Sequence, residues 1–476
     1  MMNKHLALLT VLAVLLAACS HNAPLEQPAP VLPETWHDAA GATPASAAGE
    51  QWWTLFGDPV LDALVDEAVQ HNHDIEAAAA RVLEAEAQLG ITDAARYPEV
   101  TANGEGYRRK LSESTDLPLA NTPRYENLRR LTLDASYEVD VWGKYRRASD
   151  AARAQLLAAQ YARDTVRLTL TAEVAQQYFN LLAADAQVAV LREVLQSRQD
   201  GLELLRVRLD NGVGSNYDIR QAEGEVFSVQ AQLVAALQAQ ENLESVLAIL
   251  LGRSPREVMQ GMVERGQIKP VQTLWVPDGL PSDLLLRRPD IREAEQKLLA
   301  EDANIDVARA EFFPSISLTA FLGTSSATLG NLFSGPASIF QFALGLSQPI
   351  FNAGRLDSGV KAAEARRAQA LAAYKKAVAN AFGDVRTALN AQTSGRDMLK
   401  AESDRVAAMA EAQRLANVRY LGGVASRLEV LDAERQSLQA QLDRIDAENA
   451  QRAAVVSLFK ALGGGWTQGA AEPAAQ

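Results

Sequence analysis

The chain repeats the stretch LDNGVGS, residues 209–215, as YLGGVAS, residues 420–426, and this repetition decides the fold. Both stretches offer glycine, which permits the positive φ of a tight turn, and end on a serine suited to capping a returning helix. Proline is absent from 124–254 and again from 350–472, so each stretch lies in a long proline-free segment. Because an internal proline costs a helix about 3 kcal/mol, these segments predict two pairs of unbroken helices, each pair joined by a turn.

Other landmarks repeat at nearly the same spacing, so the chain is internally duplicated. The landmarks 211 residues apart are Gly143-Lys144 with Gly354-Arg355, and Leu251-Gly252 with Leu462-Gly463. Earlier in each half, Asp74-Ile75 and Asp290-Ile291 open helical stretches at a spacing of 216 residues. The small difference in spacing falls in an intervening strand and loop region, where insertions are tolerated. Each half therefore predicts a helix, two strands, a long helix, a tight turn and a helix.

Apolar spacing supports long helices at 145–210 and 355–420, preceded by shorter ones at 60–96 and 283–311. Steps of four and three recur at Leu168, Ala172, Ala175, Phe179, Leu182, Ala186 and Ala189, at Leu191, Leu195, Leu202, Leu205 and Leu209, and at Val378, Phe382, Val385 and Leu389. Arg198 fills one place in this coiled-coil pattern. At 1.5 Å per residue such a helix is about 100 Å long, which predicts a rod or tube.

In two regions apolar and polar residues alternate with a period of two, which predicts four strands in 98–141 and 313–350. The apolar positions are Val100, Ala102, Gly104 and Gly106, Leu131, Leu133, Ala135, Tyr137, Val139 and Val141, Ile316, Leu318, Ala320 and Leu322, and Phe340, Phe342, Leu344 and Leu346. Such strands suit either a membrane barrel or a soluble sheet with one wet face. In lipid, four strands would leave open edges, so several chains would have to share one barrel, and three chains with twelve strands is the simplest solution.

Charge and histidine placement argue against nucleic-acid binding and catalysis. The formal net charge is −13, whereas nucleic-acid partners require a basic face. Histidine occurs only at positions 5, 21, 37, 71 and 73, which excludes a His-dependent nucleophilic site in the body of the chain. His71 and His73 lack further ligands for a metal, and a helix start beside Asn72 is the better interpretation. We therefore expect no enzyme activity, no cofactor and no resident metal.

The first residues predict an export signal with a lipid anchor. A basic start at Lys4 and His5 precedes an apolar run over 6–16 that is too short to cross a bilayer as a helix. The following Leu-Ala-Ala-Cys, residues 16–19, resembles a lipoprotein signal box, in which Cys19 would be acylated and become the mature N-terminus. Ser20 after the cysteine then implies delivery to the outer membrane. Residues 20–48 are rich in Pro, Ala, Ser and Thr, which is typical of a tether.

Three further stretches carry a resemblance to a known family. They are WWTLFGDPVL at 52–61, LRRPDI at 286–291 and QPIFNAGR at 348–355. Together with the duplication and the acyl signal, they resemble the TolC/OprM (NodT-type) outer-membrane efflux proteins over roughly 50–465. The resemblance implies a mainly α chain with membrane β: a homotrimer with four strands per chain in a twelve-stranded barrel, continuous with a coiled-coil periplasmic tunnel. It also implies a periplasmic adaptor and an inner-membrane pump of the resistance-nodulation-division type as partners.

The resemblance places gate and docking residues around the two turns. The expected adaptor-docking turns are Gly212, Val213, Gly214 and Ser215, and Gly422, Gly423, Val424 and Ser426. Glu429 and Asp432, three residues apart on one helical face, match the family's acidic entrance ring. Tyr420 and Asp218 match a tyrosine–aspartate gate contact, while Ala425 stands where the family's gate arginine usually falls. The alternatives are that the turns are only turns and that the acidic pair belongs to an ordinary solvated face.

The function predicted first is the passive exit duct of a tripartite efflux pump, anchored in the outer membrane and reaching into the periplasm. Alternatives are the outlet of a type I protein-secretion or metal-ion efflux system, or a periplasmic coiled coil without a pore. The expected divisions are a signal peptide (1–18), a tether (19–50), a first repeat (51–255), a linker (256–282), a second repeat (283–465) and a disordered tail (466–476).

Overall fold

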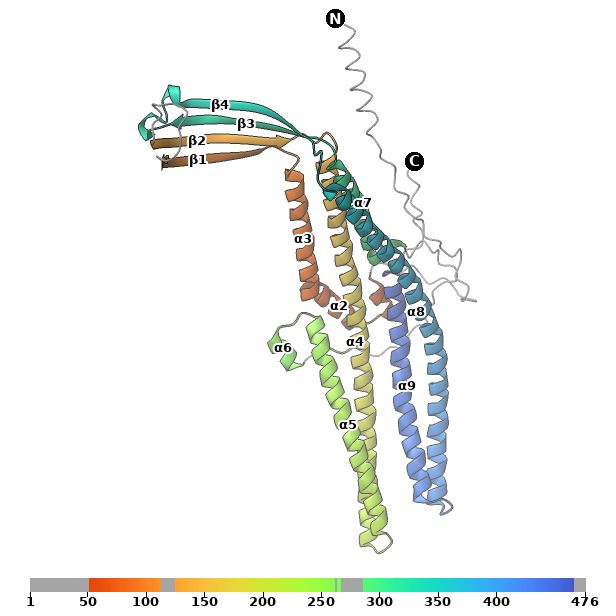
Figure 1. Cartoon of the computed structure of the whole chain (residues 1–476). Coiled ribbons are helices and arrows are strands. Elements are labelled where there is room, and N and C mark those ends of the chain that lie inside the picture. The colour runs from red at the N-terminus through yellow and green to blue at the C-terminus, as the bar shows by residue number, and fades with distance from the viewer. Residues whose placement is uncertain (1–50, 113–124, 262, 267–285, 466–476) are drawn as a thin grey trace. The chain divides into compact units, whose positions relative to one another are not determined.

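The structure is a computed structural model that describes residues 51–112, 125–261, 263–266 and 286–465 (Figure 1). All of these residues belong to one unit, Glu34–Gln476. Its principal elements are η1 (Trp52–Phe56), α2 (Pro59–His71), α3 (His73–Ala94), β1 (Glu99–Lys110), β2 (Tyr125–Glu138), α4 (Lys144–Asp210), α5 (Asn216–Leu250), α6 (Pro255–Gln260), α7 (Pro289–Ala310), β3 (Ser315–Ser326), β4 (Ser338–Ser347), α8 (Arg355–Leu421) and α9 (Arg427–Ala461). Of the described helices, none is long and apolar enough to cross a membrane.

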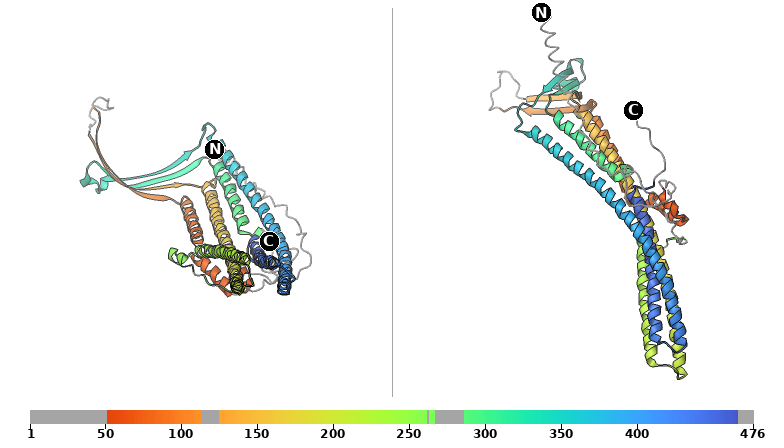
Figure 2. Two further views of the ribbon diagram at one scale, coloured as in Figure 1. Left: turned by 90° about the horizontal axis from the view of Figure 1, so that it is seen from below. Right: turned by 90° about the vertical axis from the view of Figure 1, so that its right-hand side faces the viewer.

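The predicted duplication appears as helices of equal length. Both α4 and α8 have 67 residues, both α5 and α9 have 35, and both α3 and α7 have 22. A glycine in the left-handed region precedes each long helix, Gly143 at φ 79° and Gly354 at φ 81°. The α4–α5 and α8–α9 hairpins run side by side, with α4 packed against α9 (Figure 2).

Three predicted boundaries need correction. The single helix expected over 60–96 is broken at Asn72, whose extended backbone ends α2 and whose side-chain Oδ1 accepts hydrogen bonds that cap α3. The described part of the helix expected from 283 begins at Pro289, because a proline is tolerated only in the first turn. The alternation of apolar and polar residues predicted a strand that extends to Val141, but β2 ends at Glu138.

The expected signal, tether and tail, residues 1–50 and 466–476, lie outside the described residues. The expected linker begins within α6.

Residues beside the duplicated landmarks form two equivalent contacts, here called clasps, each a hydrogen bond from a side chain near the start of α3 or α7 to the end of α5 or α9. In the first half, Asn72 Nδ2 donates to the Leu250 carbonyl at the end of α5, at 2.9 Å. In the second half, Arg288 Nη1 donates to the Ala461 carbonyl at the end of α9, at 2.8 Å. Arg288 is buried and also binds both carboxylate oxygens of Asp290. The LRRPDI stretch is therefore a structural joint between the start of α7 and the end of α9.

A glycine makes the first clasp possible. Gly252 has φ 72°, and a Cβ there would overlap the carbonyl oxygen of His71. We expect Gly252→Ala to lower the free energy of unfolding by about 2 kcal/mol, because both the backbone angle and the space forbid a methyl group. Gly224→Ala is the matched control, since Gly224 is helical with nothing near its missing Cβ, and it should be neutral or stabilising. Equal thermal unfolding of both variants in detergent would contradict this account.

The largest apolar core lies where the N-terminal segment meets α4 and α9. Trp52 is 1% exposed and stacks on Phe459 of α9, with ring centroids 5.3 Å apart. Tyr178 of α4 donates its hydroxyl hydrogen to Asp58 at 2.6 Å, and burial raises the pKa of that tyrosine. The WWTLFGDPVL stretch thus ties the start of the described chain to both hairpins.

Candidate channel-forming surfaces

The four strands form one antiparallel sheet in the order β1-β2-β3-β4, with two chemically different faces. The register aligns Val100, Ala135, Ala320 and Phe342 across all four strands, so the predicted apolar positions share one face. The large side chains exposed on that face are Val100, Leu131, Leu133, Leu318, Leu322, Phe340, Phe342, Leu344 and Leu346. A patch of this size on one face is typical of a surface that meets lipid or another protein.

The opposite face of the sheet is polar and internally hydrogen-bonded. Asp134 accepts from Asn103 Nδ2 at 2.9 Å and from Thr132 Oγ1 at 2.7 Å. The Arg130 guanidinium lies 4.6 Å from the centre of the Phe321 ring. A sheet with an apolar outer face and a polar inner face is the wall that a water-filled membrane barrel requires.

Both hairpin turns have the same backbone design. Gly212 and Gly423 adopt φ 77° and 74°, and the residue after each donates its N–H to a carbonyl five positions earlier: Val213 to Arg208 at 2.9 Å, and Val424 to Arg419 at 3.0 Å. This pattern satisfies the last carbonyls of a helix. Ser215 caps α5 and Ser426 caps α9, as expected. The predicted turn residues, including Gly214 and Gly422, therefore gather at two adjacent tips.

The turns also expose apolar side chains. Val213 is 80% exposed and Val424 is 70% exposed, and Tyr217, Leu421 and Leu428 are exposed beside them. Side chains of this kind at an exposed tip have nothing to pack against within the described chain. They are suited to contact with a partner protein.

The predicted acidic pair lies in the first two turns of α9, with both side chains exposed. The backbone N–H of Ser426 donates to Glu429 Oε1 at 3.4 Å, and Glu429 Oε2 lies 3.7 Å from Arg419. Glu429 therefore completes a capping box, a role that the Ser-x-x-Glu pattern could have shown. Asp432 accepts from the neutral amide of Gln436 at 2.6 Å, and it forms no ion pair with another residue of the described ranges.

The structure brings Tyr420 close to an arginine. The Arg427 guanidinium lies 5.9 Å from the centre of the Tyr420 ring. Between Tyr420 and Asp218, both described, no hydrogen bond forms within the chain. The tyrosine–aspartate gate contact stays a prediction.

A buried charge between the hairpins escaped the sequence analysis. Arg198 of α4 is 8% exposed and forms an ion pair with Glu434 of α9. Burial lowers the pKa of the Arg198 guanidinium, and the negative charge of Glu225 on α5 opposes that effect. The only sequence signal was an arginine in an otherwise apolar coiled-coil series. Its burial makes Arg198 the polar anchor of the α4–α9 contact.

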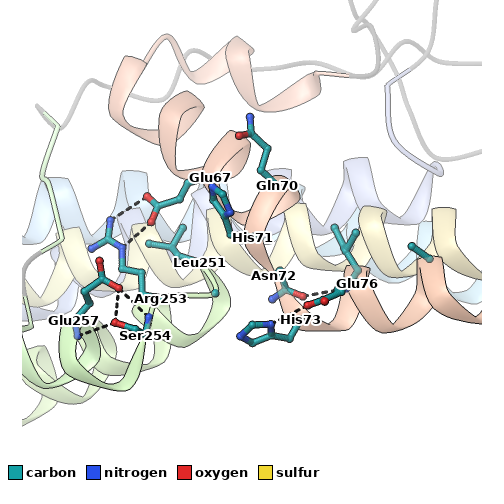
Figure 3. A pocket seen from close by; sticks show the side chains of 13 residues that line it. Glu67, Gln70, His71, Asn72, His73, Glu76, Leu251, Arg253, Ser254 and Glu257 are labelled. Carbon is teal, nitrogen blue, oxygen red and sulfur yellow. Dashed lines mark hydrogen bonds and ion pairs between the residues drawn. The ribbon is translucent and has the colours of Figure 1, made fainter.

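A cavity of about 800 Å³ lies at the first clasp, and His71 and His73 are among the residues that line it (Figure 3). Arg253 binds Glu67 through two hydrogen bonds of 2.7 and 3.0 Å, and His73 Nδ1 lies 3.2 Å from Glu76. Across the described ranges, no three His, Cys, Asp or Glu side chains are grouped to hold a metal ion. The hydrogen bonds around this cavity join α2, α3 and the end of α5, so their role is structural: they stabilise the first clasp.

Comparison with known proteins identifies the family of the chain. The family model described as outer membrane efflux protein matches residues 64–253 and 280–464. The chain belongs to the outer membrane efflux protein family. The cation efflux system protein CusC of Escherichia coli O6:H1 is 34% identical over 459 residues, covering 96% of this chain and 98% of that protein. The pyoverdine export outer membrane protein OpmQ of Pseudomonas putida is 34% identical over 469 residues, covering 97% and 98%.

Solved structures of outer membrane efflux proteins agree with the fold. The CmeC outer membrane channel of Campylobacter jejuni has a TM-score of 0.88 at 27% identity, covering 94% of this chain and 95% of that one. A CusC structure has a TM-score of 0.82 at 33% identity, covering 93% and 99%. The predicted family, fold class, efflux-channel function and outer-membrane location are confirmed. The four strands are one chain's share of a trimeric barrel that continues into a helical tunnel.

Proposed function

We propose that three copies of this outer membrane efflux protein form the passive exit duct of a tripartite pump, with no catalytic activity of their own. The observation that carries the proposal is the exposed apolar face shared by all four strands, opposite a polar face. Residues 51–255 and 283–465 would supply two equivalent portions of wall, and Cys19, outside the described residues, would carry the lipid. An inner-membrane pump of the resistance-nodulation-division type would drive transport.

We propose that the pump selects the cargo, because relatives of equal identity are named for different substrates. At 34% identity, CusC is named for cation efflux and OpmQ for pyoverdine export. Metal-ion efflux is therefore the second candidate function, and it is favoured by the similarity to CusC. Co-expression with either a drug pump or a cation pump, each with its adaptor, should restore resistance to that pump's own substrates. Restoration of only one class would instead give the duct a part in selection.

The acidic pair is proposed to form a ring of six carboxylates around the tunnel entrance. We expect Glu429→Gln with Asp432→Asn to change single-channel conductance and reduce cation selectivity, because the negative charge that attracts cations to the ring would be lost. Glutamine keeps the capping box, so helix α9 should stay intact. The measurement is conductance of the purified, acylated protein in planar bilayers.

Asp397→Asn with Asp404→Asn is the matched control. It removes the same charge from α8 away from the turn, and should leave both conductance and cation selectivity unchanged. Unaltered selectivity in the Glu429 and Asp432 variant would exclude the ring.

The two turns are proposed to dock the periplasmic adaptor through their exposed apolar side chains. Val424→Asp should weaken binding of the adaptor at least tenfold, because a charge replaces an apolar contact at the tip. Binding can be measured with the purified adaptor and the intact trimer. Leu204→Asp, which alters an exposed leucine on α4 away from the turn residues, is the matched control. Equal adaptor binding by both variants would place the docking surface elsewhere.

A further inference from the structure

Three basic side chains lie on the apolar face of the sheet, beyond its last apolar residues. Successive side chains of a strand point to opposite faces, so Arg108 and Lys110 of β1 share the face of Val100. Arg129 of β2 shares the face of Leu131, two residues away. The register brings β1 and β2 together over this whole stretch, so the three cations gather at one end of the sheet. They are here called the outward basic cluster.

The outward basic cluster lies at the end of the sheet that is farthest from the helices (Figure 1). The apolar positions extend from Leu346 of β4 to the level of Leu131, which the register places beside Ser338 through Thr324. This stretch is about 26 Å long at 3.3 Å per residue. It covers most of the apolar band, roughly 25 Å tall, that surrounds an outer-membrane barrel. Because the helical tunnel lies in the periplasm, the cluster is placed among the lipid headgroups of the external leaflet.

The polar face of the sheet balances its charges at the same level. Arg109 Nε donates to Glu126 at 2.6 Å, and Arg130 stands opposite Glu105 in the register. On the outward face, by contrast, none of the described side chains of β1 and β2 is acidic. The basic residues at this end of the sheet therefore have acidic neighbours on the face toward the lumen and none from these strands on the face toward lipid.

The two arginines of the cluster are positioned by contacts that leave their charge in place. Arg129 Nη1 donates to the Tyr107 carbonyl at 3.0 Å, and its side chain lies over Gly106, where a Cβ would be 3.3 Å from Arg129 Cδ. The Arg108 guanidinium lies 5.4 Å from the centre of the Tyr125 ring. Within the described ranges, neither arginine forms an ion pair with a carboxylate. Both guanidinium groups are thus ordered and still able to bind an anion.

We propose that the outward basic cluster binds the phosphate groups of a phosphorylated glycolipid in the external leaflet. A guanidinium forms paired hydrogen bonds to phosphate oxygens, and basic groups beside a membrane surface attract anionic lipid. The occupant is a lipid because the cluster continues directly into the apolar face, where exposed Leu131 and Leu133 can contact acyl chains. This inference rests on the proposed barrel, and adds a ligand on its outer surface, three sites to a trimer.

Binding of purified lipid A, a phosphorylated glycolipid of outer membranes, to the intact acylated trimer in detergent tests the site. Arg108→Gln with Arg129→Gln should weaken this binding at least tenfold, because each cation beside a lipid surface contributes about fivefold. Affinity is measured by titration, with native mass reporting the bound lipid. Arg109→Gln with Arg130→Gln is the matched control, since it removes the same charge from adjacent positions on the polar face. The control should bind lipid A as the native protein does.

Two further ligands identify the source of the phosphate. Lipid A stripped of its phosphates should bind the native trimer at least tenfold more weakly, and excess inorganic phosphate should leave intact lipid A bound. Displacement by inorganic phosphate would make this a site for free phosphate and overturn the lipid assignment. Equal binding of the stripped lipid would mean that the apolar face alone holds it, which overturns the phosphate contact.

The outcomes separate this site from the channel itself. Native affinity in the variant that lacks Arg108 and Arg129, or an equal loss in the control, overturns the site even if the protein conducts as a trimer. If the double variant does not assemble, Arg108→Gln alone takes its place, because Arg108 is exposed on an edge strand of the sheet. That variant should bind about fivefold more weakly, and unchanged binding overturns the site. A native protein that neither forms trimers nor conducts overturns the proposed function as well.

Discussion

Leu344→Arg should abolish assembly of the barrel in the outer membrane. Leu344 lies in the middle of β4 on the apolar face and is 72% exposed. An arginine on the lipid face near the bilayer midplane costs roughly 2–4 kcal/mol, and a trimer carries three, so the total is on the order of 6–12 kcal/mol. The trimeric fraction recovered from outer membranes should fall at least tenfold, as measured by a trimer band on mild denaturing gels.

Gln341→Arg is the control for Leu344→Arg, because it places the same charge on the same strand but on the polar face. Gln341 pairs with Phe321 and is adjacent to Phe342 on the strand, so it lies on the face opposite the apolar side chains. This variant should assemble normally and change only ion selectivity. Normal insertion of Leu344→Arg would mean that the apolar face does not meet lipid. Failure of both variants would mean that β4 tolerates no charge on either face.

Arg198→Met should destabilise the α4–α9 contact by about 3–5 kcal/mol. Arg198 and Glu434 form a buried pair, and removing one partner leaves an uncompensated charge in a region of low dielectric. The expected result is an earlier unfolding transition of the helical signal in detergent, with the strand signal lost later. Methionine is chosen because the second repeat has Met409 at the equivalent position.

A second substitution should reverse this loss. Arg198→Met with Glu434→Leu removes both charges, and well-packed apolar pairs often match or exceed the stability of a buried ion pair. Arg405→Met removes the partly exposed ion pair between α8 and Asp443 of α9 and should have only a small effect, since solvent screens such pairs. If Arg198→Met unfolds like the native protein, or the double variant is no more stable than the single one, the pair is not a buried anchor.

The parts of the fold that follow local periodicity could be predicted from the sequence. The proline-free segments and the glycine turns placed α4 and α8 to within one residue at each end, because helix propensity and turn geometry are local. The strand faces also followed from the alternation, since a period of two assigns each side chain to a face. The sharing of one barrel by several chains followed from the open edges that four strands would leave in lipid, and the family resemblance also implied a trimer.

The parts that depend on contacts distant in sequence were missed. Nothing near Arg198 in the chain indicates Glu434, which is 236 positions away and meets it only when α4 and α9 pack. The clasp residues Asn72 and Arg288 lie two residues before the repeat landmarks Asp74 and Asp290, yet their role needed the carbonyls of Leu250 and Ala461 to be located. Glu429 was assigned to the entrance ring alone, although the capping box it completes was legible in the sequence.

The equal length of α4 and α8 limits how this protein can evolve in size. An added residue advances a helix by 1.5 Å and turns every later side chain by about 100°, so a single insertion would misalign the tip and its packing together. Seven residues nearly restore the facing and lengthen the hairpin by about 10 Å. Viable length variants should therefore gain or lose whole heptads in all four hairpin helices at once, and a heptad deleted from one repeat should be rescued by the matching deletion in the other.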